Sequence, residues 1–370
     1  MCAARVLAVG MLPPPIGGQA LMFERAISAL QTDYDVAVIN TQLQSNLGDS
    51  GLFSVRKVGI AAKLLFIKIV PLLLRRRFDV LYYCLTGPSL LGAIKDLLFL
   101  TVLRFCARKT VYHFHAGGGI SYILDCNFLI RVWARLVLFR PDLVLHPPYG
   151  TPDDALLCEA KRRIIIFNAI EDPEPLAAEP PRLWPQAELS FTFVGAVTEE
   201  KGIFDLVEIA RLLRERGQYP KFTVNIVGEG NQDEITRLDE MIDRYDLKPL
   251  INRCGVLIGA EKFRLLKNST LFLFPTFFRA ETQTTAVMEA MAMGVPVIAS
   301  DWRGINTIVD QGINGYLVQP REIAAFCSAI EKTLSEGRID AMRRAARQTF
   351  LEKFLISRFI KDIRIAFGTL

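Results

Sequence analysis

The sequence predicts two doubly wound α/β domains in tandem, and three observations lead to this fold class. The chain has 370 residues, more than one ordinary hydrophobic core accommodates. Short, continuously apolar runs alternate with segments of helical periodicity in both halves, as expected for parallel strands that are covered on both faces. A stretch rich in Pro, Ala and Glu over 156–185 interrupts this alternation and is the predicted linker.

The first domain, assigned to residues 1–170, begins with a predicted strand over 5–12 and an amphipathic helix over 19–31. Further apolar runs give the other predicted strands of this half, over 35–40, 78–83, 109–115 and 142–147.

The second domain, assigned to residues 171–342, repeats the pattern, with a helix over 203–217. Its predicted strands cover 189–197, 221–230, 270–276, 295–300 and 315–320. In such folds ligands bind outside the carboxyl ends of the strands, so we expect the site in a central cleft that the two domains face.

Composition restricts the function classes. Hydrophobic residues make up 51% and charged residues 22%, a globular profile. The net charge of +5 suits anionic ligands or an anionic membrane surface, but the concentrated basic stripe of a nucleic-acid binder is missing. Seven scattered cysteines without a CxxC pair indicate a reduced, cytoplasmic setting. The N-terminal apolar stretch is short and runs into three prolines, so a buried strand explains it better than a signal peptide.

The most membrane-like segment, 58–83, is interrupted by Lys63, Lys68 and Pro71, well short of the roughly 18 to 20 apolar residues of a spanning helix. Within it, 63–78 combines apolar side chains with basic ones and is able to lie on an anionic bilayer surface. A core-packed helix with a basic end is an equally good interpretation. The basic residues are Lys63, Lys68, Arg75, Arg76 and Arg77.

Two glutamates flank a predicted helix start after the strand over 270–276. Glu281 closes the loop, and Thr282 or Thr284 can cap the helix, whose first amides and positive dipole end favour a phosphate. Glu289 lies inside the helix, where a carboxylate can accept hydrogen bonds from the vicinal hydroxyls of a ribose. On residue types alone, a capped surface helix with an ordinary pair of glutamates is the stronger interpretation.

The pattern around these glutamates is more specific. The stretch "PTFFRAETQTTAVMEAMAMGVPVIASDWRGINTIVDQGINGYLV" resembles the signature of retaining, nucleotide-sugar-dependent glycosyltransferases of the GT-B fold, the glycosyltransferase 4 or "glycosyl transferases group 1" family. The resemblance implies two Rossmann-like domains, with Glu289 on the donor ribose and Glu281 on the donor sugar. Where many members read Glu-Gly-Phe-Gly, this chain has "ETQT", so Thr284 and Thr285 would present amides and hydroxyls to the phosphate.

The resemblance extends to "FVGAVTEEKGIFDLVEIARLL", where Lys201 takes the place of a lysine that contacts the donor diphosphate. Without the motif, an exposed loop lysine is the usual interpretation. Ala196 stands where the family often has a second cation, an arginine. Cys254 and Val256 fall in the segment that reads the base, and nothing there decides between UDP, GDP and ADP.

In the first domain, Gly17 and Gly18 occupy the place of the family's glycine-rich loop, which approaches phosphate or acceptor. A GxGxxG motif is absent, which argues against an oxidoreductase. The resemblance favours His115 as the histidine that contacts the donor sugar, with His113 as the second choice and a structural histidine as the alternative. No third ligand with suitable spacing accompanies them, so no metal and no other cofactor is expected.

Together these features predict a retaining glycosyltransferase that moves a sugar from a UDP- or GDP-sugar to a hydroxyl of a glycan or lipid-linked acceptor, as in polysaccharide biosynthesis. The catalytic residues would be His115, Lys201 and Glu281. The resemblance also implies a C-terminal helix, about 343–370, that crosses back to the first domain. The expected location is cytoplasmic, peripheral at the inner face of the plasma membrane. The alternative is a regulatory or scaffold protein that binds a nucleotide sugar without turnover.

Overall fold

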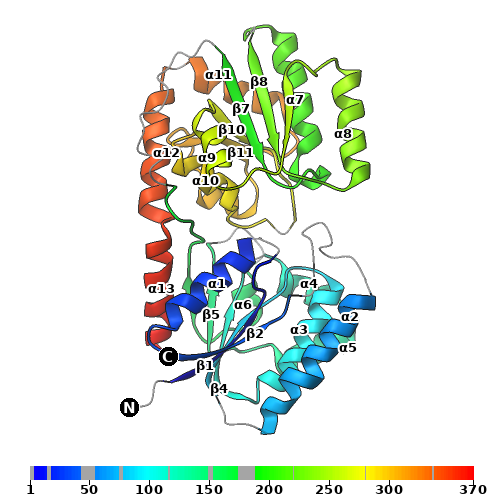
Figure 1. The fold of residues 1–370 in the computed structure, drawn as a ribbon, viewed down its shortest axis with the longest axis vertical. Helices are drawn as coiled ribbons and strands as arrows, with labels where there is room; N and C mark the ends of the chain where they lie inside the picture. The colour runs from blue at the N-terminus through cyan, green and yellow to red at the C-terminus, as the bar shows by residue number, and fades with distance from the viewer. Residues whose placement is uncertain are drawn as a thin grey trace. The chain divides into compact units, whose positions relative to one another are not determined.

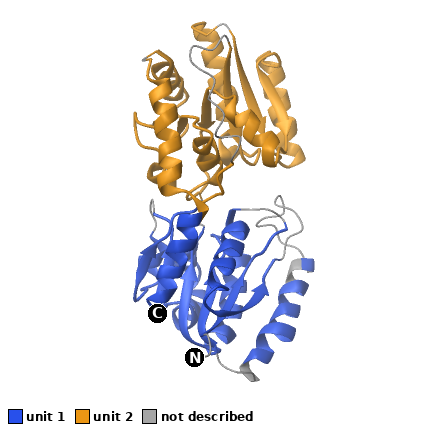
Figure 2. Cartoon of the chain, turned by 60° about the vertical axis from the view of Figure 1, so that its left-hand side comes forward, with its two compact units in different colours: residues 1–168, 357–370 blue, residues 169–356 orange. Residues whose placement is uncertain are grey.

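The structure is a computed structural model. It describes residues 4–14, 18–42, 55–74, 78–115, 117–148, 153–173, 188–219, 221–279, 281–335 and 337–370. The chain divides into two compact units, of which unit 1 comprises residues 1–168 and 357–370 and unit 2 comprises residues 169–356 (Figure 2). Each unit contains a six-stranded sheet whose recorded strand pairs are all parallel. Helices flank both sheets (Figure 1), so the predicted fold class is confirmed.

Unit 1 orders its strands β2-β1-β3-β4-β5-β6. The strands are β1 (Arg5–Gly10), β2 (Asp35–Asn40), β3 (Phe78–Cys84), β4 (Ala107–His113), β5 (Leu143–His146) and β6 (Arg163–Ile165). The helical segments are α1 (Gly18–Leu30), α2 (Val55–Lys63), η2 (Leu64–Ile69), η3 (Val70–Leu74), α3 (Leu90–Leu103), α4 (Gly119–Asp125), α5 (Phe128–Val137), α6 (Asp154–Leu157) and α13 (Ile356–Gly368).

Neighbouring tyrosines on β3 show how the two faces of this sheet are covered. Because successive strand side chains point to opposite faces, Tyr83 joins the buried cluster formed with α3 and α5, whereas Tyr82 faces α1 and α13. The ring centroid of Tyr82 lies 5.7 Å from that of Phe23 on α1 and 5.4 Å from that of Phe367 on α13. These aromatic contacts attach the last helix of the chain to unit 1.

Unit 2 orders its strands β12-β11-β10-β7-β8-β9. The strands are β7 (Leu189–Val194), β8 (Phe222–Val227), β9 (Ile251–Gly255), β10 (Leu271–Phe274), β11 (Val297–Ser300) and β12 (Gly315–Val318). The helical segments are η4 (Glu199–Lys201), α7 (Ile203–Arg216), α8 (Gln232–Arg244), α9 (Gly259–Lys267), α10 (Thr285–Ala292), η5 (Arg303–Thr307), α11 (Ile323–Ser335) and α12 (Ile339–Lys353).

Two strands are absent from the sequence prediction, and both lie at a sheet edge. The segment 156–165, predicted as linker, contains the second half of α6 and the three residues of β6, which are exposed or half-buried. Strand β9 has the polar sequence INRCG and exposes Asn252 and Arg253. An edge strand is covered less than a central one, so neither segment needs the continuous apolar run that marks a buried strand.

The helix expected over 343–370 is two helices, α12 and α13. The chain leaves the helical path at Phe354 and Leu355, where Ile170 pairs with this segment as an isolated bridge. The amide of Ile170 donates to the carbonyl of Phe354 at 2.9 Å, and the amide of Ile356 donates to the carbonyl of Ile170 at 3.0 Å. This bridge uses backbone groups that a continuous helix would bond internally.

In the described part of the chain, no helix has the length and apolar character needed to cross a membrane.

Candidate functional site

The centre of the unit 2 sheet brings together two loops that the sequence places about eighty residues apart. Strand order reverses between β7 and β10, and in doubly wound sheets such a switch point is where ligands bind. The amide of Phe277, after β10, donates to the carbonyl of Glu200, after β7, at 2.8 Å. The Thr276 hydroxyl donates to the same carbonyl at 3.2 Å. These bonds hold the two loops against each other.

Gly202 permits this close approach. Its φ is +79°, in the left-handed region, and a Cβ built on it would lie 2.1 Å from the carbonyl oxygen of Pro275. Any side chain would therefore both strain the backbone and push the two loops apart. The glycine directly after Lys201 thus sets how closely that lysine approaches the end of β10.

Lys201 and Glu281 meet at this junction. The lysine Nζ lies 2.6 Å from Oε2 of Glu281, and the side chains are only 18% and 7% exposed. Oγ1 of Thr276 also lies 3.2 Å from this carboxylate oxygen, so its single hydroxyl hydrogen is shared between Glu281 and the carbonyl of Glu200. The lysine Nζ also lies 4.8 Å from the ring centroid of Phe278, a cation–π contact. The structure therefore joins two residues that the sequence assigned separately to the diphosphate and to the donor sugar.

Helix α10 begins four residues after Glu281. Thr284 occupies the N-cap position, as one of the two predicted choices, but its side chain makes no capping hydrogen bond, and Thr285 is the first helical residue. Both threonines are half-buried. The first amides of the helix and its dipole provide positive partial charge there, so an anion would be stabilised next to the Lys201 and Glu281 pair.

Glu289, about one turn into α10, is paired with Lys262 on α9. The lysine Nζ donates to Oε1 of Glu289 at 2.7 Å, and the side chains are 18% and 14% exposed. Burial raises the pKa of Glu289, and the charge and hydrogen bond of Lys262 oppose that rise. The sequence analysis missed Lys262, because nothing in the primary structure links a lysine on one helix to a glutamate on the next.

The predicted base-reading residues lie at the end of β9. Cys254 is half-buried, and its thiol donates to the carbonyl of Asn252 at 3.8 Å. Burial raises the pKa of that thiol. Val256 is 55% exposed, so it offers an apolar surface to a planar ligand. Ala196 is exposed in the loop after β7, at the position without the second cation.

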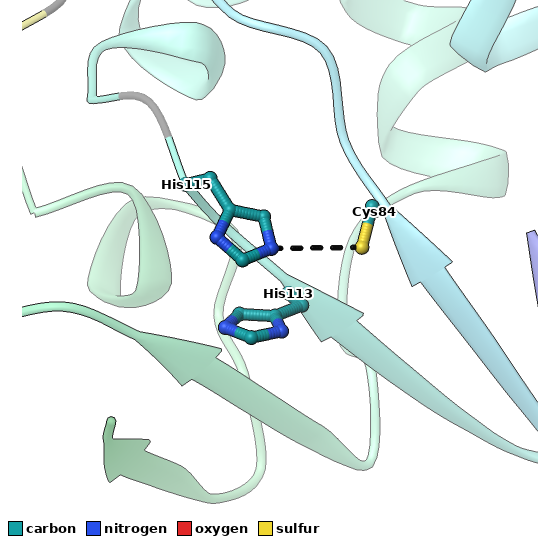
Figure 3. Close-up of side chains that lie close together, drawn as sticks. All are labelled: Cys84, His113 and His115. Atoms are coloured by element: carbon teal, nitrogen blue, oxygen red, sulfur yellow. Dashed lines mark hydrogen bonds between the residues drawn. The ribbon is translucent and has the colours of Figure 1, made fainter. Parts of the chain in front are cut away.

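In unit 1, His113 ends β4 and His115 follows it, and both are buried (Figure 3). Their ring centroids are 3.9 Å apart, so the two rings lie on the same side of the strand end, as residues two apart along a strand do. Nδ1 of His113 shares a hydrogen bond of 2.6 Å with the Tyr82 hydroxyl. Nε2 of His115 lies 3.8 Å from Sγ of Cys84, at the end of the neighbouring strand.

Both histidines are neutral at physiological pH. Burial lowers the pKa of His115 to about 4, although a hydrogen bond with Asn168 opposes the shift. The pKa of His113 falls well below its ordinary value through burial and through the nearby His115 and His146. They are therefore hydrogen-bonding groups and not cations. His146, at the end of β5, brings all three histidines of the chain to this edge of the sheet, which the sequence analysis did not foresee.

The structure places Cys84 beside the two histidines, where it is a potential third metal ligand that the sequence did not suggest. Ligand atoms of Cys84, His113 and His115 all lie within 4.8 Å of one another. Burial raises the pKa of the Cys84 thiol far above its ordinary value, so the thiol is protonated. Because metals bind the thiolate, an ion here would have to displace that proton, and His113 is already engaged by Tyr82. The geometry thus describes a neutral hydrogen-bonded cluster.

The predicted glycine loop of unit 1 is described only in part. Gly18 begins α1 and is exposed, whereas Gly17 lies outside the described residues. Gln19 donates from Nε2 to the carbonyl of Leu85 at 3.1 Å, which ties the start of α1 to the end of β3.

Sequence comparisons identify relatives of the C-terminal half. Residues 188–336 match the family described as "Glycosyl transferases group 1". The amylovoran biosynthesis glycosyltransferase AmsK of Erwinia amylovora is 31% identical over 153 residues, 40% of this chain and 36% of that protein. The glycogen synthase of Mycobacterium tuberculosis is 31% identical over 192 residues, 51% of this chain and 44% of that protein. Each match spans less than half the length of the relative.

Structural comparisons cover the whole chain. HepE of Anabaena, solved in complex with UDP and glucose, superposes with a TM-score of 0.66 and 15% identity over 99% of both chains. The lipopolysaccharide outer core galactosyltransferase WaaB, in its apo form, gives 0.71 and 15% identity over 99% of this chain and 100% of that one. At such identities the likeness concerns the fold. The chain therefore has the GT-B fold, and its C-terminal half, residues 188–336, is similar to the group 1 glycosyltransferase family.

Proposed function

We propose that this protein transfers a sugar from a nucleoside diphosphate sugar to a hydroxyl acceptor, with retention of configuration at the reacting carbon. The observation that carries the proposal is the buried pair of Lys201 and Glu281 at the switch point of the unit 2 sheet, with Glu281 four residues before α10 begins. At the carboxyl ends of two neighbouring strands, a cation and a helix N-terminus can bind the diphosphate, and a carboxylate can bind the sugar hydroxyls.

Binding of the donor would break the contact between Lys201 and Glu281 and give each side chain a partner on the donor. Lys201, which contacts Glu281 at 2.6 Å, would turn to the diphosphate together with the first amides of α10. Glu281 would then be free to accept hydrogen bonds from the sugar hydroxyls. Because negative charge grows on the leaving diphosphate, the lysine and amides stabilise the transition state more than the ground state. With this charge supplied by the chain, we propose that transfer needs no metal ion and that EDTA leaves it unchanged.

Glu289 would accept hydrogen bonds from the ribose hydroxyls, with Lys262 holding it ionised. Cys254 and Val256 would contact the base through backbone groups and apolar surface. Solved structures of HepE with UDP and with UDP-glucose support a uridine nucleotide as the first donor to test, with GDP-sugars second.

His115 would contribute a hydrogen bond to the donor sugar, in its neutral form. We assign no covalent nucleophile, so retention would come from the acceptor hydroxyl approaching on the same face as the departing diphosphate. The acceptor would be a glycan or a lipid-linked saccharide, as in polysaccharide biosynthesis, and the biosynthetic role in the name of AmsK supports this class. Action would take place in the cytoplasm, at the inner face of the membrane.

One observation favours a second candidate, a protein that binds nucleotide sugars without turnover. The position of the family's frequent second cation is held by Ala196, whose methyl group cannot contact a phosphate by charge. If the diphosphate clamp were too weak for catalysis, donor binding would remain while transfer was lost.

The test is calorimetric titration of the purified chain with UDP, GDP and ADP without added metal. We expect one nucleotide to bind selectively and Glu289→Ala to abolish the heat, while Glu240→Ala, an exposed glutamate on α8, leaves it unchanged. Turnover of the matching sugar nucleotide, lost in Lys201→Ala and Glu281→Ala, separates the enzyme from the binder. Failure of all three nucleotides to bind would overturn both candidates.

A further inference from the structure

Unit 1 exposes an unusual number of large apolar side chains on three neighbouring helical segments. Leu129 is 76%, Leu136 73%, Phe105 71%, Phe128 68% and Phe66 67% exposed. We call this set, with its weaker members, the apolar face. It consists of Phe66 and Ile67 on η2, Leu98 and Phe105 on α3 and the turn after it, and Phe128, Leu129, Val132 and Leu136 on α5. Single exposed apolar residues are ordinary, but a gathered set indicates an interaction surface.

Helix α5 shows that the exposure is built into the fold. Phe128, Val132 and Leu136 follow one another at intervals of four residues, so they form one row along the helix. The opposite side is anchored, because Ala134 and Val137 are buried in the unit 1 core. The indole of Trp133 donates to the Thr101 hydroxyl on α3 at 2.9 Å. The helix is thus fixed to α3 by one apolar side while a second apolar side faces outward.

The three segments form one surface. Helix α3 contacts both η2 and α5, and Figure 1 shows α2, α3 and α5 gathered on the side of unit 1 away from α1 and α13. Leu98 lies on the same side of α3 as Thr101, the residue that Trp133 of α5 contacts, and Phe105 follows in the turn after α3. The apolar rows of α3 and α5 are therefore neighbours.

The charge on this surface has one sign. Lys63, Lys68, Arg131 and Arg135 are exposed, and neither 55–74 nor 128–140 contains an acidic residue. The single acidic residue of α3, Asp96, is buried. It accepts hydrogen bonds from the Tyr83 hydroxyl at 2.7 Å and the Thr86 amide at 2.8 Å and pairs with Lys95 at 3.0 Å. Arg131 and Arg135, four residues apart, border the apolar row of α5.

We propose that the apolar face docks unit 1 on the surface of an anionic phospholipid bilayer. Apolar side chains would enter the headgroup boundary while the bordering arginines and lysines contact lipid phosphates. A second copy of the chain fits less well, because two-fold pairing of this surface would set the basic residues of one copy against those of the other. The sequence indicated only 63–78; α3 and α5 add the larger part. The inference stands independently of the donor chemistry.

The test is co-sedimentation of the full chain with phosphatidylcholine vesicles, with and without phosphatidylglycerol. We expect binding only with the anionic lipid. Leu129→Gln with Leu136→Gln, and separately Arg131→Gln with Arg135→Gln, should each weaken the partition coefficient roughly tenfold or more. The matched controls are Leu156→Gln, an exposed leucine on α6, and Arg244→Gln, an exposed arginine on α8, and both should bind like the unaltered chain.

Two further measurements separate the outcomes. Circular dichroism and thermal unfolding of each α5 variant should match the unaltered chain, so a loss of vesicle binding cannot be confused with a failure of folding. The proposal is overturned if anionic vesicles leave the chain in solution, or if the controls lose binding as much as the α5 variants do. It is also overturned if sedimentation velocity shows a dimer that the α5 substitutions dissociate and vesicles do not bind.

Discussion

Lowering the pH from 7.5 to 5.5 should leave His115 neutral in the folded protein but charge it in the unfolded chain. Its pKa falls from an ordinary 6.5 to about 4, chiefly because the ring is buried at the end of β4. Unfolding is then coupled to proton uptake between these two values. The contribution of neutral His115 to stability is therefore complete above pH 6.5 and is lost as the pH falls from there towards 4.

The magnitude follows from the two pKa values. Linkage gives a loss of about 1.3 kcal/mol in the free energy of unfolding between pH 7.5 and 5.5 for this residue alone. The full difference between 6.5 and about 4 corresponds to roughly 3 kcal/mol. His113, whose pKa is also lowered by burial, shifts stability in the same direction.

The chain has only three histidines, which makes the assay direct. With histidine-selective isotope labelling, the ring resonances can be followed by NMR from pH 8 to 5 and assigned by the loss of one signal in His115→Gln. We expect the His115 resonance to keep its neutral position across this range. Urea unfolding of the two proteins should show the smaller pH dependence in the variant. A His115 signal that titrates near 6.5 would refute the burial argument, and so would identical pH dependence of stability.

Three further perturbations test the geometry of the two units. Lys262→Met should lower the free energy of unfolding by roughly 1–3 kcal/mol, because it leaves the buried Glu289 carboxylate without its cation. It should also raise the pKa of Glu289, so that the stability of the variant protein declines further as the pH rises. Equal denaturation curves of the variant at pH 6 and 8 would contradict this. Gly202→Ala should cost at least roughly 1–3 kcal/mol, because its Cβ would overlap the carbonyl of Pro275, and should weaken nucleotide affinity in calorimetry; unchanged affinity would show that the loop contact is dispensable. Asp154→Ala should speed amide hydrogen exchange in α4, because the buried carboxylate accepts three amide hydrogen bonds at the start of that helix; unaltered exchange would mean that water replaces it.

Local pattern was sufficient for the sheet interiors and for the spacing of the candidate residues. A central parallel strand is buried on both faces, so β10 is apolar throughout and β1 is apolar after Arg5, and both can be recognised without any partner. The edge strands β6 and β9 carry no such requirement, and the sequence did not reveal them.

The amino-acid sequence therefore specifies what one segment requires of its own residues, namely the α/β class and the helix start between Glu281 and Glu289. The contacts between distant side chains depend on how strands and helices pack in the folded chain. Lys201 reaches Glu281 because strand order places β7 beside β10, and Lys262 reaches Glu289 because α9 contacts α10. Cys84 approaches the histidines because β3 neighbours β4. Such contacts join residues tens of positions apart, and strand order and helix packing, which no local periodicity encodes, bring them together.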